Sequence, residues 1–500
     1  MPMNSEITRT SNVSTPPGVL WSLALFLDLL LTALILIEPT VRGAESTSAV
    51  KPAASSQLRL PCGPPGPGRF GAYWTKLSYE PSWDKPWRIG DYADVVIRFD
   101  QFEHRFVFWR GTSYVPCWAT PEGPWFSNEY FERPGGKVSR TTSMVEPMSD
   151  KKTRYSHVRV IENTEARVVI QWRYAPTDLE YTLAFVDEQT GWGDWADEFY
   201  TIYPDSVGVR KATLYTSALN EWIEYQESIV VNQPGAGPED SLNLTALTLA
   251  NLKGESKDYT WTERDSPDLS KPPEDTCIQL VNLKSKFKPF TIFNPEGATV
   301  SSYGGHAPGS HFNFWNHWPV AQEKSDTSVA KSADRPSHTS LSHLKWKPYA
   351  QDEKSQTWIH LHGMTDQPAA KLGMLGKSWL FPPDLKVSRG GFSSQGYDPT
   401  QRAYLLQNEQ PGQPSTLEIE LTASPEQPVV NLCLVIRNWG PAAAKLKLNG
   451  QSLPRGKDFR FGYRDSLEGR DLIVWIRAEA TSALRLTLSP VTNKVQTGFN

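Results

Sequence analysis

Hydrophobic and polar residues alternate over short stretches along most of this chain. The segments 179–185 (LEYTLAF) and 209–215 (VRKATLY) show the pattern most clearly. Such alternation is typical of antiparallel strands that bury one face and expose the other. Similar β-branched and aromatic runs, about twenty in all, recur from residue 72 onward between turn residues, without a long amphipathic helix. The pattern predicts an all-β protein, built as a large antiparallel β-sandwich of the supersandwich type.

The N-terminal segment is predicted to be an export signal. Residues 19–37 form an apolar run interrupted by Asp28, and the small residues Val41 and Gly43 follow at positions suited to signal-peptidase cleavage. We expect residues 1–43 to be cleaved, because an aspartate in the middle of a permanent membrane span is costly. A retained N-terminal anchor is the alternative. The protein is then secreted, periplasmic or on the cell surface, and it contacts a membrane only through this segment if it stays uncleaved.

The rest of the chain divides by composition into three parts. Residues 44–71 are rich in proline, serine and other small residues, and are predicted to be a linker. Residues 72–412 hold most of the strand patterns and form the expected main β-sandwich. Residues 413–500 have short strands and only two tryptophans, Trp439 and Trp475. This last part is either a small closing sandwich or a continuation of the main one.

Composition narrows the classes of partner. The formal net charge is only -4, so no basic field points to a nucleic acid. Nineteen tryptophans suit either a core between sheets or platforms on which sugar rings stack. The cysteines are widely spaced and form no CxxC pair, which leaves two disulfides or buried free thiols open. They are Cys62, Cys117, Cys277 and Cys433.

The segment Ser301–His343, here called the His-rich loop, contains five of the nine histidines. It lacks the periodicity of a helix or a strand, and its aromatic residues argue against disorder. We expect an ordered loop beside a surface cleft. Its candidate catalytic residues are His311 and His317, and its candidate substrate-binding residues are Trp315, Asn316 and Arg335. The histidine spacing is not HExxH, so no residue is assigned to a metal and no cofactor is expected with certainty, although Zn²⁺ or Ca²⁺ stays open.

A second candidate is the strand-like run 154–159 (RYSHVR). Strand alternation would place Tyr155, His157 and Arg159 on one face, with Arg154 on the other. A base and a cation in one row suit β-elimination from a uronic acid polymer, because the base removes the proton beside the carboxylate and the cation stabilises the resulting charge. A solvated strand face with ordinary cross-strand pairs is the alternative.

Two further segments carry suitable side chains. Gly111–Glu132 interleaves aromatic and polar residues, and Trp118 and Trp125 are its candidate sugar platforms; a hairpin packed between sheets explains them equally well. The segment 191–211 supplies acids that would suit a glycosidase or Ca²⁺, or are simply solvated turn residues. These acids are Asp194, Asp197, Glu198 and Asp205.

Four longer stretches carry a resemblance to a known family. They are WRGTSYVPCWAT, EPMSDKKTRYSHVRVIENTEARVVIQWRY, DEFYTIYPDSVGVRK and FWNHWPVAQ. Over about residues 72–490 the chain resembles large secreted β-sandwich proteins of marine and planctomycete-type bacteria that degrade algal polysaccharides, and it is most similar to ulvan-lyase-like polysaccharide lyases. The resemblance implies a lyase that places His, Tyr and Arg around an acidic sugar. That role would fall on Tyr155, His157 and Arg159, with the His-rich loop opposite.

Three functions therefore stand at this point. The first is a secreted lyase that cleaves a uronate-containing polysaccharide such as ulvan by β-elimination. The second is a glycoside hydrolase. The third is a secreted protein that binds carbohydrate, or serves at the cell surface, without chemistry.

Overall fold

The computed structural model describes residues 68–77, 92–135, 144–316, 318, 336–411, 413 and 415–491. The predicted signal or anchor, most of the predicted linker, His317 and Arg335 lie outside these residues. No helix in the described ranges is both long and apolar enough to cross a membrane.

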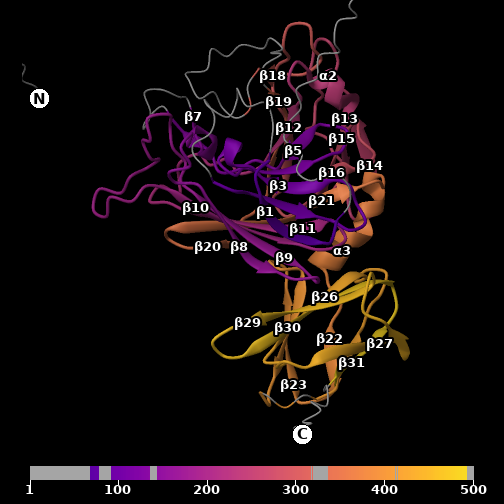
Figure 1. Ribbon diagram of the computed structural model, residues 1–500. Helices are drawn as coiled ribbons and strands as arrows, with labels where there is room; N and C mark the ends of the chain where they lie inside the picture. Colours follow the sequence, from indigo (N-terminus) through magenta and orange to yellow (C-terminus); the bar gives the residue numbers. More distant parts are fainter. Residues whose placement is uncertain are drawn as a thin grey trace, which may run out of the picture. The chain divides into compact units, whose positions relative to one another are not determined.

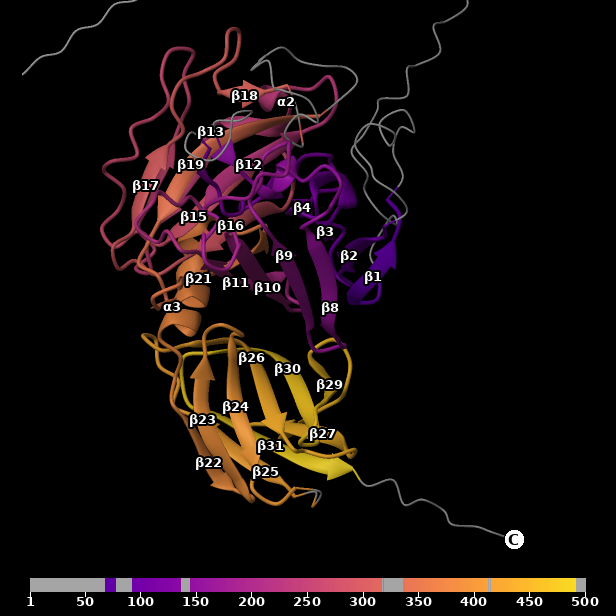
Figure 2. The same ribbon diagram turned by 90° about the vertical axis from the view of Figure 1, so that its left-hand side faces the viewer.

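Two large sheets make up most of the fold (Figures 1 and 2). The nine-stranded sheet runs β1 (Gly71–Thr75), β2 (Asp94–Arg98), β3 (Arg105–Phe108), β4 (Pro116–Ala119), β5 (Trp125–Ser127), β12 (Glu227–Asn232), β19 (Ser337–Lys345) and β17 (Thr299–Ser302), with β18 (Phe314–Trp315) also paired to β19. The ten-stranded sheet runs β14 (Ser256–Tyr259), β13 (Leu242–Ala250), β15 (Ile278–Leu283), β16 (Lys288–Ile292), β21 (Ser355–Thr365), β11 (Val207–Tyr215), β10 (Trp195–Ile202), β9 (Val168–Tyr174) and β8 (His157–Asn163), with β20 (Ala350–Gln351) paired to β21.

Short elements connect these sheets. They are the strand pair β6 (Arg133–Pro134) and β7 (Met144–Val145), the helices α2 (Pro238–Ser241) and α3 (Gly373–Leu380), and the 3-10 turns η1 (Arg110–Thr112), η2 (Pro147–Ser149) and η3 (Ala369–Leu372). The inner faces of the two large sheets share one hydrophobic core, to which both contribute tryptophans such as Trp118 and Trp172. This is the antiparallel β-sandwich that the alternating pattern predicted.

A second, smaller sandwich follows in the chain and has a hydrophobic core of its own. One sheet contains β22 (Leu385–Arg389), β25 (Leu417–Leu421), β31 (Leu484–Val491), β27 (Ala443–Leu448) and β28 (Gln451–Leu453). The other contains β23 (Phe392–Asp398), β24 (Ala403–Asn408), β26 (Val429–Arg437), β30 (Arg470–Ala480) and β29 (Phe459–Asp465), and its β24–β26 pair is parallel. The boundary expected at residue 413 falls between β24 and β25, inside this sandwich.

Polar contacts join the smaller sandwich to the loops of the larger one. Arg402 forms a buried ion pair with Asp205 at 3.1 Å, and the Tyr203 hydroxyl donates to the carbonyl of Gln401. Beside them, a small apolar cluster brings Ala166 and Tyr203 against Trp475. The described residues between 68 and 491 accordingly belong to one compact unit.

One expected strand is not a strand. The alternating segment 179–185 forms turns, while 209–215 lies within β11 as predicted. Asp178 accepts hydrogen bonds from the backbone N–H groups of Glu180 and Thr182, at 2.9 and 2.8 Å, which replaces the ladder bonds of a strand. Tyr181 also has a φ of 68°, in the left-handed region. The prediction of a strand here was wrong because a local side-chain turn overrides the pattern.

The described cysteines are buried free thiols. Cys117, Cys277 and Cys433 form no disulfide among the described residues, and Cys62 lies outside them. Burial raises the pKa of the Cys277 thiol to about 12, so this thiol stays protonated and packs as a small apolar side chain.

Candidate functional site

Two tetrapeptides of the form Glu-Tyr-x-Glu lie side by side in the nine-stranded half of the large sandwich. The first is Glu129–Glu132 and the second is Glu224–Glu227. Glu132 and Glu224 exchange backbone hydrogen bonds of 2.9 and 3.3 Å. This pairing gathers four carboxyl groups in one place, here called the acid cluster.

Glu129 occupies a strained position. It follows β5, and its φ of 60° lies in the left-handed region that a long side chain rarely adopts. Residues three apart in a regular strand face opposite sides, so this bend helps to bring Glu129 and Glu132 to one cluster. Strain of this kind persists only where the surroundings hold it, and it is common at functional sites.

The neighbouring Asn128 shows how the bend is held. Its carbonyl accepts a hydrogen bond from Arg210 at 2.8 Å. Its side-chain oxygen accepts from Gln226 at 2.9 Å and from Thr291 at 2.8 Å. One residue therefore fixes the first tetrapeptide to the second and to strands β11 and β16, which preorganises the site.

His343 on β19 completes the cluster. It is the direct cross-strand partner of Glu227 on β12, and the register shifts just beyond this pair. Its Nδ1 makes a short contact with the Glu224 carboxylate, and its ring stacks on Tyr303 with centroids 5.1 Å apart. The His343 side chain is 24% exposed, whereas Glu224 is 9% exposed. The imidazole therefore stands at the mouth of a buried group of acids, and the register shift is a means of aiming such side chains.

A fifth carboxyl extends the cluster inward. Glu146 precedes η2 and accepts a hydrogen bond from the Tyr130 hydroxyl at 2.9 Å. Both residues are buried. Burial raises the pKa of the Glu146 carboxyl, although hydrogen bonds from Glu132 and Tyr130 oppose the shift.

Burial and mutual repulsion favour the protonated forms of Glu129, Glu132 and Glu227. Burial raises the pKa of Glu129 and of Glu132 well above the usual range, and neighbouring carboxylates add to both shifts. Burial also raises the pKa of Glu227, to about 7, against the opposing effects of His343 and Ser340. Near neutral pH, neutral carboxylic acids therefore stand beside a carboxyl that is close to half ionised.

His343 is shifted in the direction of its charged form. Burial alone would lower the pKa of its imidazole, but the hydrogen bond to Glu224 and the charge of Glu227 raise it overall. Burial and the surrounding carboxylates raise the pKa of the Tyr303 hydroxyl. Imidazolium and phenol are thus both proton donors at this mouth.

Two of the acids have unused hydrogen-bonding capacity. Neither carboxyl oxygen of Glu129, nor Oε1 of Glu227, has a hydrogen-bond partner within the described ranges. Both residues are buried, at 1% and 7% exposure. The carboxyl groups of Glu129 and Glu227 contact each other, and this contact is a hydrogen bond only when one of the two groups is protonated. The raised pKa values of both groups agree with such a bond. Buried polar atoms without partners are uncommon and mark a place where a ligand can bind.

Metal binding was open from the sequence. In the part of the chain that the structure describes, no three His, Cys, Asp or Glu side chains are grouped as metal ligands would be.

The run 154–159 lies at the edge of the ten-stranded sheet. His157 and Arg159 alternate outward on β8 and are exposed, as the pattern predicted. Tyr155 is half-buried just before the strand, and Arg154 is exposed with its guanidinium 5.2 Å from the Tyr155 ring centre. The run 154–159 is therefore not part of the acid cluster, which involves β12 and β19 of the nine-stranded sheet.

The two tryptophans proposed as sugar platforms belong to the core. Trp118 and Trp125 are each 1% exposed. Trp118 donates to His362 at 3.0 Å, and Trp125 packs edge-on against Trp109 at 6.1 Å. A buried indole has no free face for a sugar ring. The two tryptophans therefore fit the alternative interpretation, in which this segment is a hairpin packed between sheets.

The described part of the His-rich loop reaches the acid cluster through Trp315. This half-buried indole pairs with His338 across β18 and β19 and meets Tyr303 edge-on at 5.2 Å. Asn316 follows it and is also half-buried. His311 lies elsewhere in the loop, where its backbone N–H donates to Glu239 at 2.8 Å. His317 and Arg335 are not among the described residues.

The acids of segment 191–211 are held in ion pairs. Glu198 pairs with Arg210 at 2.7 Å, and Asp194 with Arg133 at 2.8 Å, with all four side chains buried. Asp197 pairs with Arg173 at 2.9 Å. With Asp205 bound to Arg402, these acids stabilise the fold.

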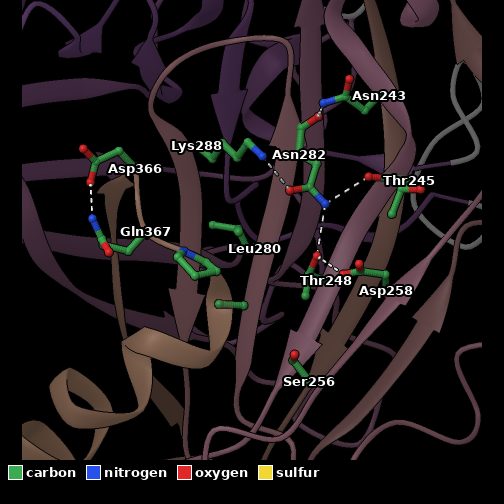
Figure 3. Close-up of a pocket in the computed structure, with 12 residues that line it drawn as sticks. Asn243, Thr245, Thr248, Ser256, Asp258, Leu280, Asn282, Lys288, Asp366 and Gln367 are labelled. Atoms are coloured by element: carbon green, nitrogen blue, oxygen red, sulfur yellow. Dashed lines mark hydrogen bonds between the residues drawn. The ribbon is translucent and has the colours of Figure 1, made fainter.

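A polar cavity of about 560 Å³ lies on the ten-stranded sheet (Figure 3). Across its floor, Lys288 donates to Asn282 at 3.1 Å, Asn282 donates to Thr248 at 3.1 Å, and Thr248 donates to Asp258 at 2.6 Å. The register between β13 and β15 shifts here, and Asn282 also donates to the Thr245 carbonyl at 2.9 Å. These side chains largely satisfy one another and the irregular backbone, so this cavity is a weaker candidate than the acid cluster.

The comparisons with known proteins leave the family open. No family model and no curated protein matches the chain. Among solved structures, the chain is similar to galactose 1-epimerase from Lactobacillus acidophilus NCFM, with 8% identity and a TM-score of 0.23 over 59% of this chain and 98% of that one. A similarity at this level carries no argument about function, so the function has to be argued from the residues themselves.

Sequence reasoning missed most of the acid cluster. Glu129 and Glu132 were visible only as polar members of an aromatic segment, and His343 as the last residue of the His-rich loop. The repeated Glu-Tyr-x-Glu tetrapeptide was the available signal. Its meaning depends on the backbone pairing of Glu132 with Glu224, 92 positions apart in the chain, which local pattern does not reveal.

Proposed function

We propose that the protein is a polysaccharide lyase that cleaves an acidic, uronate-containing polysaccharide by β-elimination at the acid cluster. The observation that carries the proposal is the pairing of Glu227 with the partly exposed His343, beside the carboxyl groups of Glu129, Glu132 and Glu224. This arrangement offers a base, two acids and hydrogen-bond donors within one site.

The neutral acids would recognise the sugar carboxylate. Removal of the proton at C5 of a uronate places additional negative charge on its carboxylate group. Donors aimed at that group stabilise the charge, and a carboxylic acid kept neutral by burial is such a donor. Glu129 is suited to this role, because burial and the neighbouring carboxylates favour its protonated form, and this form avoids the repulsion that an ionised cluster would cause.

Glu227 would serve as the base. With a pKa raised to about 7, this carboxyl is substantially ionised at neutral pH and still basic enough to take a proton. In the elimination, Glu227 takes the C5 proton, the C–H electron pair forms the C4–C5 double bond, and the C4–O bond breaks. The departing oxygen receives a proton from Tyr303 or from the imidazolium of His343, which face the mouth.

Glycoside hydrolysis is the second candidate, and the number of carboxyl groups favours it. Many hydrolases use one protonated and one ionised carboxyl group on either side of the bond. Glu227 with its raised pKa would then be the acid, and Glu224 the second carboxyl group. The two reactions need Glu227 in opposite protonation states.

Product analysis tests the proposal. The purified protein is incubated with ulvan, alginate, pectin and glycosaminoglycans, and the products are followed by ultraviolet absorbance and mass spectrometry. Elimination gives an absorbing, unsaturated uronate at the new non-reducing end. Hydrolysis gives reducing ends without that absorbance, and it would replace the first proposal by the second. Binding without any product would contradict both.

A further inference from the structure

A group of aromatic rings and arginines lies on the outer surface of the ten-stranded sheet, away from the shared core. It is formed by residues just before β8, on β9 and β10, and in the turns between β9 and β10. We call it the aromatic–arginine face, and its members are Arg154, Tyr155, Arg173, Tyr181, Trp192 and Trp195. Figure 2 shows β8, β9 and β10 side by side.

The rings form a continuous series. Tyr155 lies 6.1 Å from Tyr181 and 5.9 Å from Trp195, measured between ring centroids. Trp195 in turn lies 6.3 Å from Trp192. Trp192 is 63% exposed, so one end of the series presents a large apolar ring to solvent. An exposed tryptophan continuous with other aromatic rings is a common mark of a binding surface.

Cations are placed on these rings. The Arg154 guanidinium lies 5.2 Å from the Tyr155 ring centre and 5.6 Å from that of Tyr181. Arg173 lies 5.0 Å from the Trp195 ring centre and pairs with Asp197. Stacking on rings limits the motion of each guanidinium and leaves N–H donors at its edge, which suits bidentate recognition of carboxylate or sulfate.

Neighbouring residues extend the positive charge. His157 is the cross-strand partner of Arg173, and Arg159 follows two positions later on the same exposed side of β8. Further across the sheet, Lys211 of β11 is paired with Phe199 of β10. Asp197, on the same side of β10, is already bound to Arg173, and Glu180 and Glu188 are exposed acids in the adjoining turns.

The backbone beside the face is strained. Tyr181 has a φ of 68° and Phe185 a φ of 43°, both unusual for bulky aromatic residues. The turns are held instead by Asp178, whose side chain accepts the N–H groups of Glu180 and Thr182. The chain thus holds Tyr181 beside Arg154 in a conformation with an intrinsic cost, which is a feature of binding sites more than of plain turns.

We propose that the aromatic–arginine face binds a chain of an acidic polysaccharide without cleaving it. Sugar rings stack on the exposed indole of Trp192, and carboxylate or sulfate groups pair with Arg154 and Arg173. Charge complementarity decides the occupant, because a neutral glycan would leave the ring-stacked guanidinium groups unused. The face has its own residues and does not depend on the acid cluster, so this proposal stands even if the proposed reaction fails.

The test is affinity electrophoresis of the full-length protein in two kinds of gel. One contains ulvan, which is a sulfated uronate polysaccharide, and the other contains neutral dextran. Ulvan should retard the wild-type protein, the retardation should weaken as salt rises, and dextran should have no effect. Trp192→Ala and Arg154→Ala should each weaken binding roughly tenfold. The comparison is repeated with both substitutions placed in a Glu227→Gln background, so that cleavage of the gel polymer at the acid cluster does not alter the retardation.

The controls are an exposed aromatic residue and an exposed arginine elsewhere in the chain. Phe381, at the end of α3, is 50% exposed, and Arg389 of β22 has a 74% exposed side chain. Phe381→Ala and Arg389→Ala should leave retardation unchanged. Equal weakening by these controls, equal retardation in dextran, or wild-type binding by both face variants would overturn the proposal.

Discussion

Glu227 and His343 face each other across the β12–β19 pair, at the point where the register of that pair shifts. Each affects the protonation of the other: the charge of Glu227 raises the pKa of His343, and His343 opposes the upward shift that burial imposes on Glu227. The protonation of the two side chains is therefore linked.

The pH dependence of turnover should reveal the role of Glu227. Its pKa is about 7. If Glu227 is the base of an elimination, kcat/KM rises as pH increases through about 7, because the ionised form is required. If it is the acid of a hydrolysis, kcat/KM falls over the same interval. A pH profile of initial rates measures this, and a profile flat between pH 6 and 8 would mean that Glu227 takes no part.

Substitution of His343 should remove activity without unfolding the protein. His343→Gln cannot become a cation and should lower kcat by roughly a hundredfold or more. Glu224→Gln removes the charge that helps to raise the His343 pKa, so it should lower kcat and shift the pH profile. His306→Gln, at an exposed position of the same loop, is the control and should behave like the wild type. Thermal unfolding of all three verifies their folding.

The Glu198–Arg210 pair should matter for stability instead. Glu198 also accepts hydrogen bonds from Tyr174 at 2.7 Å and from Tyr200 at 2.5 Å, and the whole network is buried. Glu198→Ala leaves the Arg210 charge without its partner, which typically costs about 3–5 kcal/mol. Asp465→Ala, in an exposed pair with Arg470, should cost far less, because solvent screens the pair. Denaturant unfolding compares the two, and similar losses would contradict the structural role of the network.

His157 and Tyr155 offer a direct comparison of two interpretations. If they form part of the catalytic site, as their spacing suggested, His157→Ala lowers kcat by roughly a hundredfold. If they belong to the outer surface that binds the polymer, the variant raises KM on long chains and leaves kcat nearly unchanged. Kinetics on long and short substrates distinguish the two, and we expect the second result from the exposure of His157 on β8.

Much of the fold could be predicted from the alternating pattern. The strands around 157–161 and 209–215 were identified from their alternation. In the structure, β8 alternates between exposed and half-buried residues, whereas β11 is buried along most of its length. The segment 179–185 shows where the method fails, because the Asp178 side chain satisfies the local backbone and the chain turns. A small closing sandwich was one of the two alternatives for residues 413–500. The smaller sandwich begins earlier, at β22, where no change of composition marks residue 385.

The site was harder to predict than the fold. The sequence pointed to the His-rich loop, and Trp315 does reach the acid cluster through Tyr303. Glu129 and Glu132 were noticed only as polar members of an aromatic segment, and Glu224 and Glu227 were not singled out, because their protonation depends on burial between strands that are distant in sequence. The segment 154–159 combined the expected residue types, but local alternation cannot say which side of a sheet faces a cleft.

The most direct test of the central claim is the rate of formation of an ultraviolet-absorbing product from ulvan by the wild type and by Glu227→Gln. The substituted glutamine keeps the size of the side chain but cannot take a proton. The account predicts a steady rise in absorbance with the wild type, and a rate lowered by roughly a hundredfold or more with the variant at unchanged thermal stability. Equal rates in the two proteins would place the chemistry outside the acid cluster and contradict the account.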